Sequence, residues 1–300
     1  MVAADQGRSP ADGSPLEQRL GAGNIDEALV LSGAAHWNQG AADWRLFIEH
    51  GTVWGLRMRG GSDDGRLVAS AAILPYGERF GWVSMVLVLP EFRGRGYATR
   101  LVHRALDALR SDGRAALLDA TPDGRPVYSR EGFADSWGFA RWRREPGPAP
   151  GAAPGASVRP VSASDWAAIL AQDLPVFGAD RGWLLRALHA RQPALAHVHR
   201  RAGGGGIDGY VFGRDGREAT QLGPVIARDP AAAIRLIRAA LAQVPGAAYL
   251  DLTDRHRVLV PELETLGFVH QRPFTRMVLD AATAPGAADD LVAVAGPELG

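Results

Sequence analysis

The sequence predicts an α/β protein made of two copies of one mixed-sheet unit. In each half, short strand-like runs rich in Val, Leu and Ala alternate with helix-like segments. Residues 118–121 read Leu-Asp-x-Thr and residues 250–253 repeat this pattern, while a Gly-Phe pair at 132–133 returns at 267–268. These pairs are separated by similar distances, which favours a duplicated unit over two unrelated α/β domains.

Composition divides the chain into four segments. Residues 1–23 are small and polar, so we expect a disordered tail. Residues 24–145 form the first predicted domain, and residues 158–300 form the second. Between them, residues 146–157 are almost all Ala, Gly and Pro, a composition typical of a linker.

The order of elements in the first half follows from periodicity. A helical region is expected over 25–50, then two strands at 52–59 and 66–74 joined by a Gly-Asp turn. A strand at 81–89 precedes a helix over 97–110, in which Leu101, Ala105 and Leu109 recur at helical spacing. A strand at 115–120, a short helix near 127–131 and a closing strand at 139–143 complete the unit.

The second half repeats this order. Expected in turn are a strand at 157–161, helices within 164–170 and 181–190, a hairpin spanning 194–214, a strand at 220–227, a helix over 230–244, a strand at 247–252, a helix within 258–266 and a strand at 274–279. Pro230 suits the first position of its helix. The four-glycine run 203–206 is predicted to be a hairpin tip.

Composition also excludes several classes of site. The 300 residues carry 33 basic and 33 acidic side chains, so no excess of positive charge indicates that the protein binds nucleic acid. All the basic residues other than His are Arg, which excludes a lysine nucleophile or base, and the absence of Cys excludes thiolate chemistry. No apolar run or signal pattern indicates a membrane segment, so a cytoplasmic protein is expected, and the histidines indicate no metal site.

The turn "RGRG", residues 93–96, is the clearest candidate for a ligand site. Gly94 and Gly96 can adopt positive φ and let a ligand approach the backbone. The amides that begin the next helix are free to bind an anion, with Arg93 and Arg95 beside them. The turn therefore predicts a phosphorylated ligand, and two classes are candidates: a dinucleotide, for which Asp119 would meet a ribose, and coenzyme A. Two observations argue against the dinucleotide. Thr99 stands where the dinucleotide fingerprint has its third glycine, and the turn follows three strands, whereas that fingerprint usually opens its βαβ unit.

Residues beyond the turn favour coenzyme A. Arg93, Gly96 and Ala98 form R-x-x-G-x-A between a strand and a helix, and Tyr128 to Phe133 form Y-x-x-x-G-F. In this combination the sequence resembles the GCN5-related N-acetyltransferase (GNAT) family, and the whole chain resembles tandem GNAT proteins. The resemblance implies two domains, each with a mixed, mostly antiparallel sheet flanked by helices, and acetyl transfer from acetyl-CoA to a primary amine without a covalent intermediate.

The resemblance also assigns roles to residues. The backbone of Val86, Leu87 and Val88 would bind the pantetheine arm, and Tyr128 would protonate the departing thiolate, since a phenol is protonated at neutral pH. Trp37, Asn38, Asp43 and Trp44 would border the acceptor, a small-molecule or peptide amine. The pyrophosphate would bind the turn residues Arg93, Gly94, Arg95, Gly96, Tyr97, Ala98 and Thr99.

The sequence does not identify the general base that would deprotonate the acceptor amine. No acid lies between Trp82 and Leu89, where only Ser84 could orient a water. Asp43, Glu78 and Asp119 are all candidates.

The second copy departs from the family pattern. It has no R-x-x-G-x-A, and Leu263 stands where Tyr128 stands in the first copy. We therefore expect a non-catalytic second domain, in which Asp180 and Arg181 could help to form the acceptor site. Two alternatives stay open: a non-catalytic acyl-CoA sensor and an NAD-type oxidoreductase.

Overall fold

The computed structural model describes residues 14–148, 157–201 and 206–300. Its 13 strands form a single sheet in the order β1-β2-β3-β4-β5-β12-β6-β11-β13-β10-β9-β8-β7. The strands are β1 (Leu16–Arg19), β2 (Thr52–Arg57), β3 (Leu67–Tyr76), β4 (Phe80–Val88), β5 (Ala115–Ala120), β6 (Ala134–Arg144), β7 (Val158–Pro160), β8 (His197–Arg200), β9 (Ile207–Arg214), β10 (Thr220–Ala227), β11 (Ala248–Thr253), β12 (Phe268–Leu279) and β13 (Leu291–Ala293). Most neighbours pair antiparallel, which confirms the expected mixed sheet.

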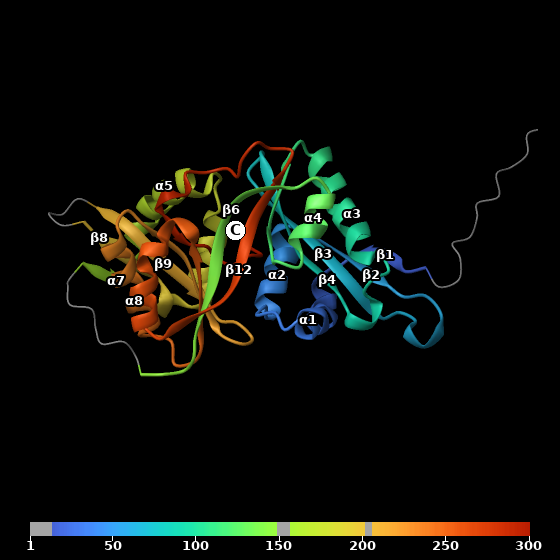
Figure 1. The fold of residues 1–300 in the computed structure, drawn as a ribbon, viewed down its shortest axis with the longest axis horizontal. Coiled ribbons are helices and arrows are strands. Elements are labelled where there is room, and N and C mark those ends of the chain that lie inside the picture. The colour runs from blue at the N-terminus through green and yellow to red at the C-terminus, as the bar shows by residue number, and fades with distance from the viewer. Residues whose placement is uncertain (1–13, 149–156, 202–205) are drawn as a thin grey trace, which may run out of the picture.

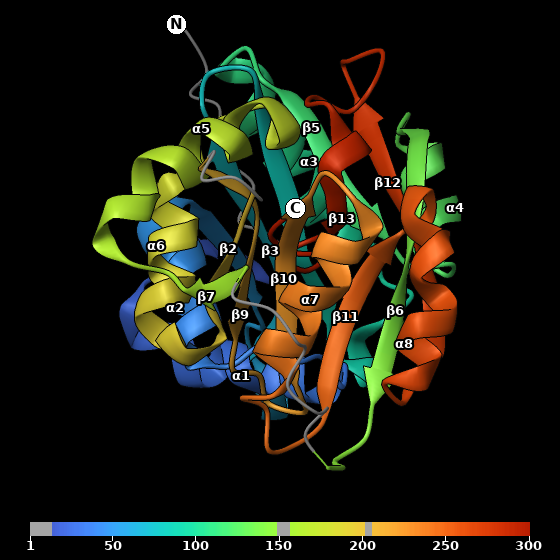
Figure 2. The same ribbon diagram turned by 90° about the vertical axis from the view of Figure 1, so that its left-hand side faces the viewer.

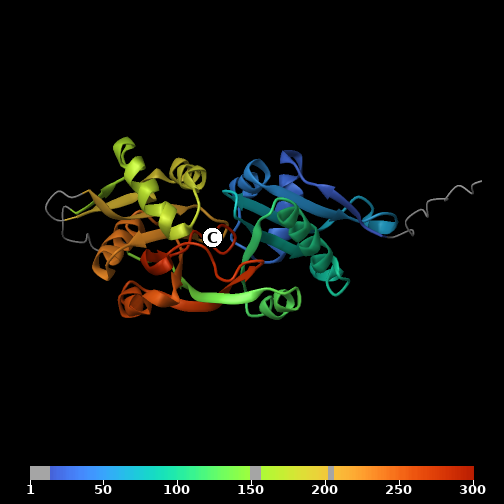
Figure 3. The same ribbon diagram turned by 90° about the horizontal axis from the view of Figure 1, so that it is seen from above.

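Helices cover both faces of this sheet. They are α1 (Ile25–Ala34), α2 (Ala41–His50), α3 (Tyr97–Ser111), α4 (Arg125–Arg130), α5 (Trp166–Phe177), α6 (Gly182–Arg191), α7 (Pro230–Leu241) and α8 (Val260–Thr265). Viewed from above, α1 and α2 in blue and α5 and α6 in yellow-green lie on one side of the sheet, and α3 and α7 lie on the other (Figure 3). Within the described ranges, no helix combines the length and the apolar character needed to cross a membrane.

Helix α3 shows how the periodicity of the sequence becomes packing. Leu101, Val102, Ala105, Leu106 and Leu109 recur every three or four residues and are all buried, so they form one apolar stripe. This stripe faces β3 and β4. Each buried aliphatic side chain of this size contributes about 1.5–3 kcal/mol of hydrophobic free energy. The helix is thereby fixed against the strand that ends at the glycine turn.

The two halves exchange the long strands β6 and β12. β12 of the second half pairs with β5 of the first, and β6 of the first half pairs with β11 of the second. β6 and β12 also pair with each other, and they run side by side through the centre of the molecule in green and orange (Figure 1). Neither half completes its sheet alone. The domain boundaries at 145 and 158 remain predictions, and most of the expected linker lies outside the described residues.

The expected disordered tail is wrong for its second part. Leu16–Arg19 form β1 and pair antiparallel with β2, because the edge of β2 offers free backbone groups. Glu17 also forms ion pairs with Arg100 and Arg104 of α3. Residues 1–13 of the expected tail, and glycines 203–205 of the expected hairpin tip, lie outside the described residues.

The segment after β12 returns to the middle of the molecule. It forms β13 beside β10 and β11 (Figure 2) and continues through residues 294–300, nearly all of which are buried. Residue 300 lies between the two halves (Figure 1). The last element predicted from the sequence is the strand at 274–279, so β13 was not expected.

Candidate active site

Strands β4 and β5 pair only at their beginnings and then diverge. Parallel pairing joins Phe80–Trp82 to Ala115–Leu117, and beyond it β4 pairs with β3 alone. A β-bulge in this part of β4 places Met85 at a φ of 53°. Residues 86–88, predicted to bind the pantetheine arm, therefore lie on a strand edge that has no partner on the β5 side within the described part of the chain.

The glycine turn lies at the far end of this open edge. Gly94 and Gly96 have φ values of 74° and 78°, the left-handed region that glycine adopts most easily. In the described part of the chain, the amides of residues 94–99 donate no hydrogen bond, and the first helical bond runs from the Arg100 amide to the Gly96 carbonyl at 3.0 Å. Consecutive free amides at the start of a helix form an anion site.

The second half has closed both of these features. β10 and β11 also diverge, but β13 lies between them and pairs with each. The start of α7 is capped, because the Asp229 carboxylate accepts a hydrogen bond of 2.8 Å from the Ala232 amide and Pro230 has no amide hydrogen. A carboxylate thus stands where the first half leaves amides free, and Leu263 of α8 is fully buried in the core.

A cavity of about 60 Å³ lies where β4 and β5 diverge. Tyr128 of α4 lines it, and burial raises the pKa of this phenol to about 12, so it stays protonated at neutral pH. Both halves contribute to the lining, which consists of Trp37, Asn38, Gln39, Val83, Ser84, Met85, Val86, Leu118, Asp119, Thr121, Tyr128, Arg141, Arg272, Phe274, Pro297 and Glu298.

The four predicted acceptor residues separate into two pairs. Trp37 and Asn38 line the cavity, and the Asn38 amide holds the second half by accepting hydrogen bonds from the Glu218 and Ala219 amides and donating to the Ala219 carbonyl. Asp43 and Trp44 do not line it. Both are fully buried.

Asp43 and Trp44 are engaged elsewhere. The Asp43 carboxylate accepts hydrogen bonds from Arg191 at 2.7 Å and Arg214 at 2.8 Å. The Trp44 indole donates to the hydroxyl of Ser32 at 3.2 Å. These contacts give both residues a structural role instead of a place at the acceptor site.

The carboxylates near the cavity are also not equivalent. The Asp119 side chain is buried and paired with Arg276, and although burial raises its pKa, the pairing opposes the shift. Arg276 engages both oxygens of this carboxylate, which weakens the case for a ribose contact and so for a dinucleotide. Glu78 lies exposed in the turn between β3 and β4, away from the cavity lining. Glu298, which the sequence analysis missed, lines the cavity and pairs with Arg214.

Several contacts fix the segment that carries Glu298. The Tyr76 hydroxyl donates to the Leu299 carbonyl at 2.7 Å, and the Trp82 indole donates to the Pro297 carbonyl at 3.0 Å. Arg181, proposed for the acceptor site, instead pairs with Asp173 and donates to the Gly300 carbonyl at 2.9 Å. The second half therefore places the Glu298 carboxylate in a cavity beside β4 of the first half. No local sequence motif predicted this position.

Asp180 and the strand histidines also have structural partners. Asp180 accepts a hydrogen bond from the Gly182 amide at the start of α6. His197 and His199, alternating on β8, are both buried, and His199 pairs with Asp208. Among the described residues, no group of three or more His, Asp and Glu side chains is arranged to hold a metal.

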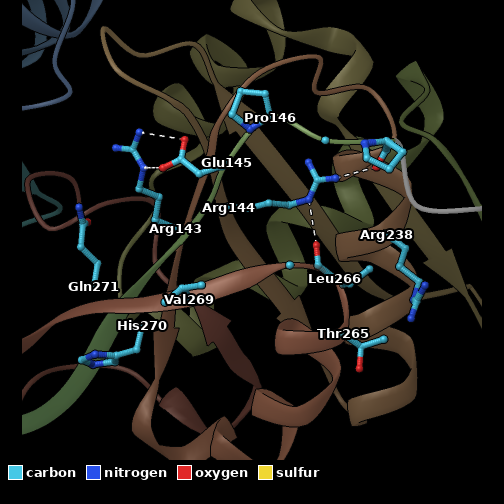
Figure 4. Close-up of a pocket in the computed structure, with 13 residues that line it drawn as sticks. Arg143, Arg144, Glu145, Pro146, Arg238, Thr265, Leu266, Val269, His270 and Gln271 are labelled. Carbon is cyan, nitrogen blue, oxygen red and sulfur yellow. Dashed lines mark hydrogen bonds and ion pairs between the residues drawn. The ribbon is translucent and has the colours of Figure 1, made fainter.

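A larger hollow, of about 850 Å³, lies where β6 leaves the sheet (Figure 4). Its lining comes from residues 143–148, from Arg238 of α7, from residues 265–267 and from the start of β12, and it includes none of the predicted site residues. In this view, Arg143 pairs with Glu145, and Arg144 donates to the Leu266 carbonyl at 2.9 Å. These arginines are therefore engaged with the protein itself, and this hollow is not the candidate active site.

Comparisons with known proteins agree with this geometry. A protein of Bacillus subtilis (strain 168) described as an uncharacterized N-acetyltransferase, YitH, is 23% identical over 82% of this chain and 84% of its own length. A holothin acyltransferase of Pseudoalteromonas sp. (strain SANK 73390) is 28% identical over 68% of this chain and 65% of its own length. The crystal structure of a putative acetyltransferase from Pyrococcus horikoshii covers both chains completely, with a TM-score of 0.78 and 16% identity, which shows a common fold.

Family models match both halves of the chain. Residues 31–133 match the acetyltransferase (GNAT) family, and residues 169–293 match an acetyltransferase (GNAT) domain. The repeated unit is accounted for by two such domains in sequence. The chain belongs to the GNAT family of acetyltransferases, with two GNAT domains in tandem.

Proposed function

We propose that the first half is an acetyl-CoA-dependent N-acetyltransferase that acetylates a primary amine in a ternary complex. The observation that carries this proposal is the arrangement of three features at β4: the free amides of residues 94–99, the unpaired strand edge before them, and the cavity that Val86 and Tyr128 line. Pyrophosphate would bind the amides, pantetheine would lie along residues 86–88, and the thioester would reach the cavity. Acyl transfer is supported by the family and by the names of both relatives.

The chemistry needs a proton acceptor and a proton donor. An ammonium acceptor first loses a proton. Two carboxylates line the cavity: Arg276 engages both oxygens of Asp119, whereas among the described residues only one oxygen of Glu298 is engaged, by Arg214. We therefore assign Glu298 to receive the proton, directly or through a water. The free amine attacks the thioester carbonyl, and the carbon–sulfur bond breaks. Tyr128 protonates the thiolate, and the amine nitrogen loses its second proton to solvent. Ser84, whose buried hydroxyl has no partner among the described residues, is placed to hold such a water.

A non-catalytic acyl-CoA sensor is the alternative. It is favoured by the lack of an acid on β4, since Glu298 reaches the cavity only through the second half. The second half would then serve the site by holding this segment, and not by binding a coenzyme of its own.

The test combines binding with turnover. Acetyl-CoA at about 100 times its Kd should raise the free energy of unfolding by about 2.7 kcal/mol, whereas NAD should leave the melting temperature unchanged. Release of free thiol from acetyl-CoA should depend on an added amine. Binding without amine-dependent thiol release across a broad panel would support the sensor, and a lack of binding would reject both.

A further inference from the structure

Arg272 of β12 is the cation in the cavity lining whose charge is not balanced by the protein. Within the described ranges it forms no ion pair and donates no hydrogen bond, and its Nε atom is buried without a partner. Burial lowers the pKa of its guanidinium group, which still remains charged at neutral pH. An unpaired, partly desolvated charge of this kind is costly unless a ligand compensates it.

The other arginines around the cavity are paired. Arg141, which also lines it, donates two hydrogen bonds of 2.8 Å to Asp251. Arg214 pairs with both Asp43 and Glu298. Arg276, four residues along the same strand from Arg272, pairs with Asp119. The unpaired state of Arg272 is therefore specific to this position.

Strand pairing makes this position less favourable still. Arg272 stands opposite Arg141 in the register of β12 with β6, and like charges directly opposite each other are destabilising. A bulge between His270 and Arg272 sets the register there, and bulges re-aim side chains. The guanidinium lies 5.0 Å from the ring centre of Phe274, another cavity residue, which holds it at the lining.

We propose that the acceptor amine carries an acidic group, a carboxylate or a phosphate, and that Arg272 binds this oxyanion. The guanidinium fork matches both groups. Within the same lining, Arg214 engages one carboxylate oxygen of Glu298, and the other oxygen, which has no partner among the described residues, can accept a hydrogen bond from the ammonium end of such an acceptor. The inference rests on the proposed N-acetyltransferase function and narrows its acceptor class to small zwitterionic amines.

Matched acceptor pairs test this with the full chain. Phosphoethanolamine is compared with ethanolamine, and alanine with alaninamide, by thiol release from acetyl-CoA. At least one acidic member should have a kcat/KM about tenfold to a hundredfold higher than its neutral partner, the range expected for a hydrogen-bonded charge. The better pair distinguishes phosphate from carboxylate. Equal or better turnover of both neutral partners would overturn the inference and leave the proposed function standing, whereas no turnover of any amine would count against the function itself.

Variants separate acceptor binding from folding. Arg272→Met should remove the preference for the acidic member while keeping turnover of the neutral amine, which also reports a folded protein. Arg272→Lys should restore part of the preference. Arg143→Met is the matched control, because Arg143 lies on the neighbouring strand, outside the cavity lining. A loss of CoA affinity in Arg272→Met, with the acceptor preference unchanged, would show that Arg272 serves the coenzyme and would overturn the inference.

Discussion

Arg276 donates two hydrogen bonds, each of 2.9 Å, to the carboxylate of Asp119, which lies 157 positions earlier in the chain. The two residues are register partners across β12 and β5, so this ion pair joins β12 of the second half to the first half. It engages both carboxylate oxygens of Asp119, whereas Arg214 engages only one oxygen of Glu298, and this difference supports the proposal that Glu298 is the base.

Arg276→Met should lower the free energy of unfolding by roughly 3–5 kcal/mol in urea titrations, because it leaves a buried carboxylate without its partner. Burial already raises the pKa of Asp119, and the variant lacks the arginine that opposes this shift. The loss of stability should therefore be smaller near pH 4–5, where the folded variant binds a proton, and larger at pH 8. Arg276→Met with Asp119→Leu should recover much of the stability. The exposed Arg257→Met is the control, and an equal effect there would contradict the assigned role of the pair.

Gly96→Ala should weaken binding of CoA by about tenfold or more. Its φ of 78° strains any side chain, by about 1–2 kcal/mol, and a methyl group would project where the phosphates approach the amides. Gly113→Ala offers a matched comparison, since Gly113 has a φ of 69°, also has open space around its Cβ position and lies past the other end of α3. Isothermal titration should show weaker binding only for Gly96→Ala. Equal affinities of the two variants would exclude the turn from the coenzyme site.

Local features of the sequence predicted the local parts of the structure well. The stripe of α3, the glycine turn and the short helix with Tyr128 all follow from spacing within about 15 residues, and each was found at its predicted place. Hydrophobic periodicity determines such elements because the contacts that stabilise them are close in sequence.

The composition of the cavity could not be predicted in this way. Arg272 and Glu298 reach it only because the halves exchange strands and because the chain returns after β12 to form β13 beside β10 and β11. Asp43 shows the converse, since its sequence position beside Trp37 and Asn38 suggested acceptor binding, yet two arginines of the second half pair with it. Pairing between distant segments is not encoded in local periodicity.

Tyr128→Phe should lower kcat by about 10²-fold or more while changing the affinity for CoA by less than about twofold, because the phenol is needed to protonate the thiolate and not to bind the coenzyme. With its pKa raised to about 12, Tyr128 should impose no decline of kcat between pH 7 and pH 10. Steady-state thiol release over this range checks both points. Unchanged turnover in the variant would remove Tyr128 from the mechanism.

Glu298→Gln should lower kcat at pH 7 by about 10²-fold, since the amide cannot accept the proton of the ammonium. The amide oxygen can still accept a hydrogen bond from Arg214, so stability should change little. Raising the pH should restore part of the rate, because the amine then loses its proton to water. Glu264→Gln, on the exposed face of α8, is the control. A normal kcat in Glu298→Gln would show that another group accepts the proton of the ammonium.

CoA should bind once per chain. In the first half the edge of β4 is open and the amides before α3 are free, whereas in the second half β13 fills the corresponding gap and Asp229 caps α7. Gly223 permits this filling, because a Cβ there would lie 2.1 Å from the Val294 carbonyl oxygen. Titration calorimetry should give a stoichiometry of one, and Gly96→Ala should weaken that single site. Two sites, or one site insensitive to Gly96→Ala, would mean that the second half binds coenzyme despite its own strand.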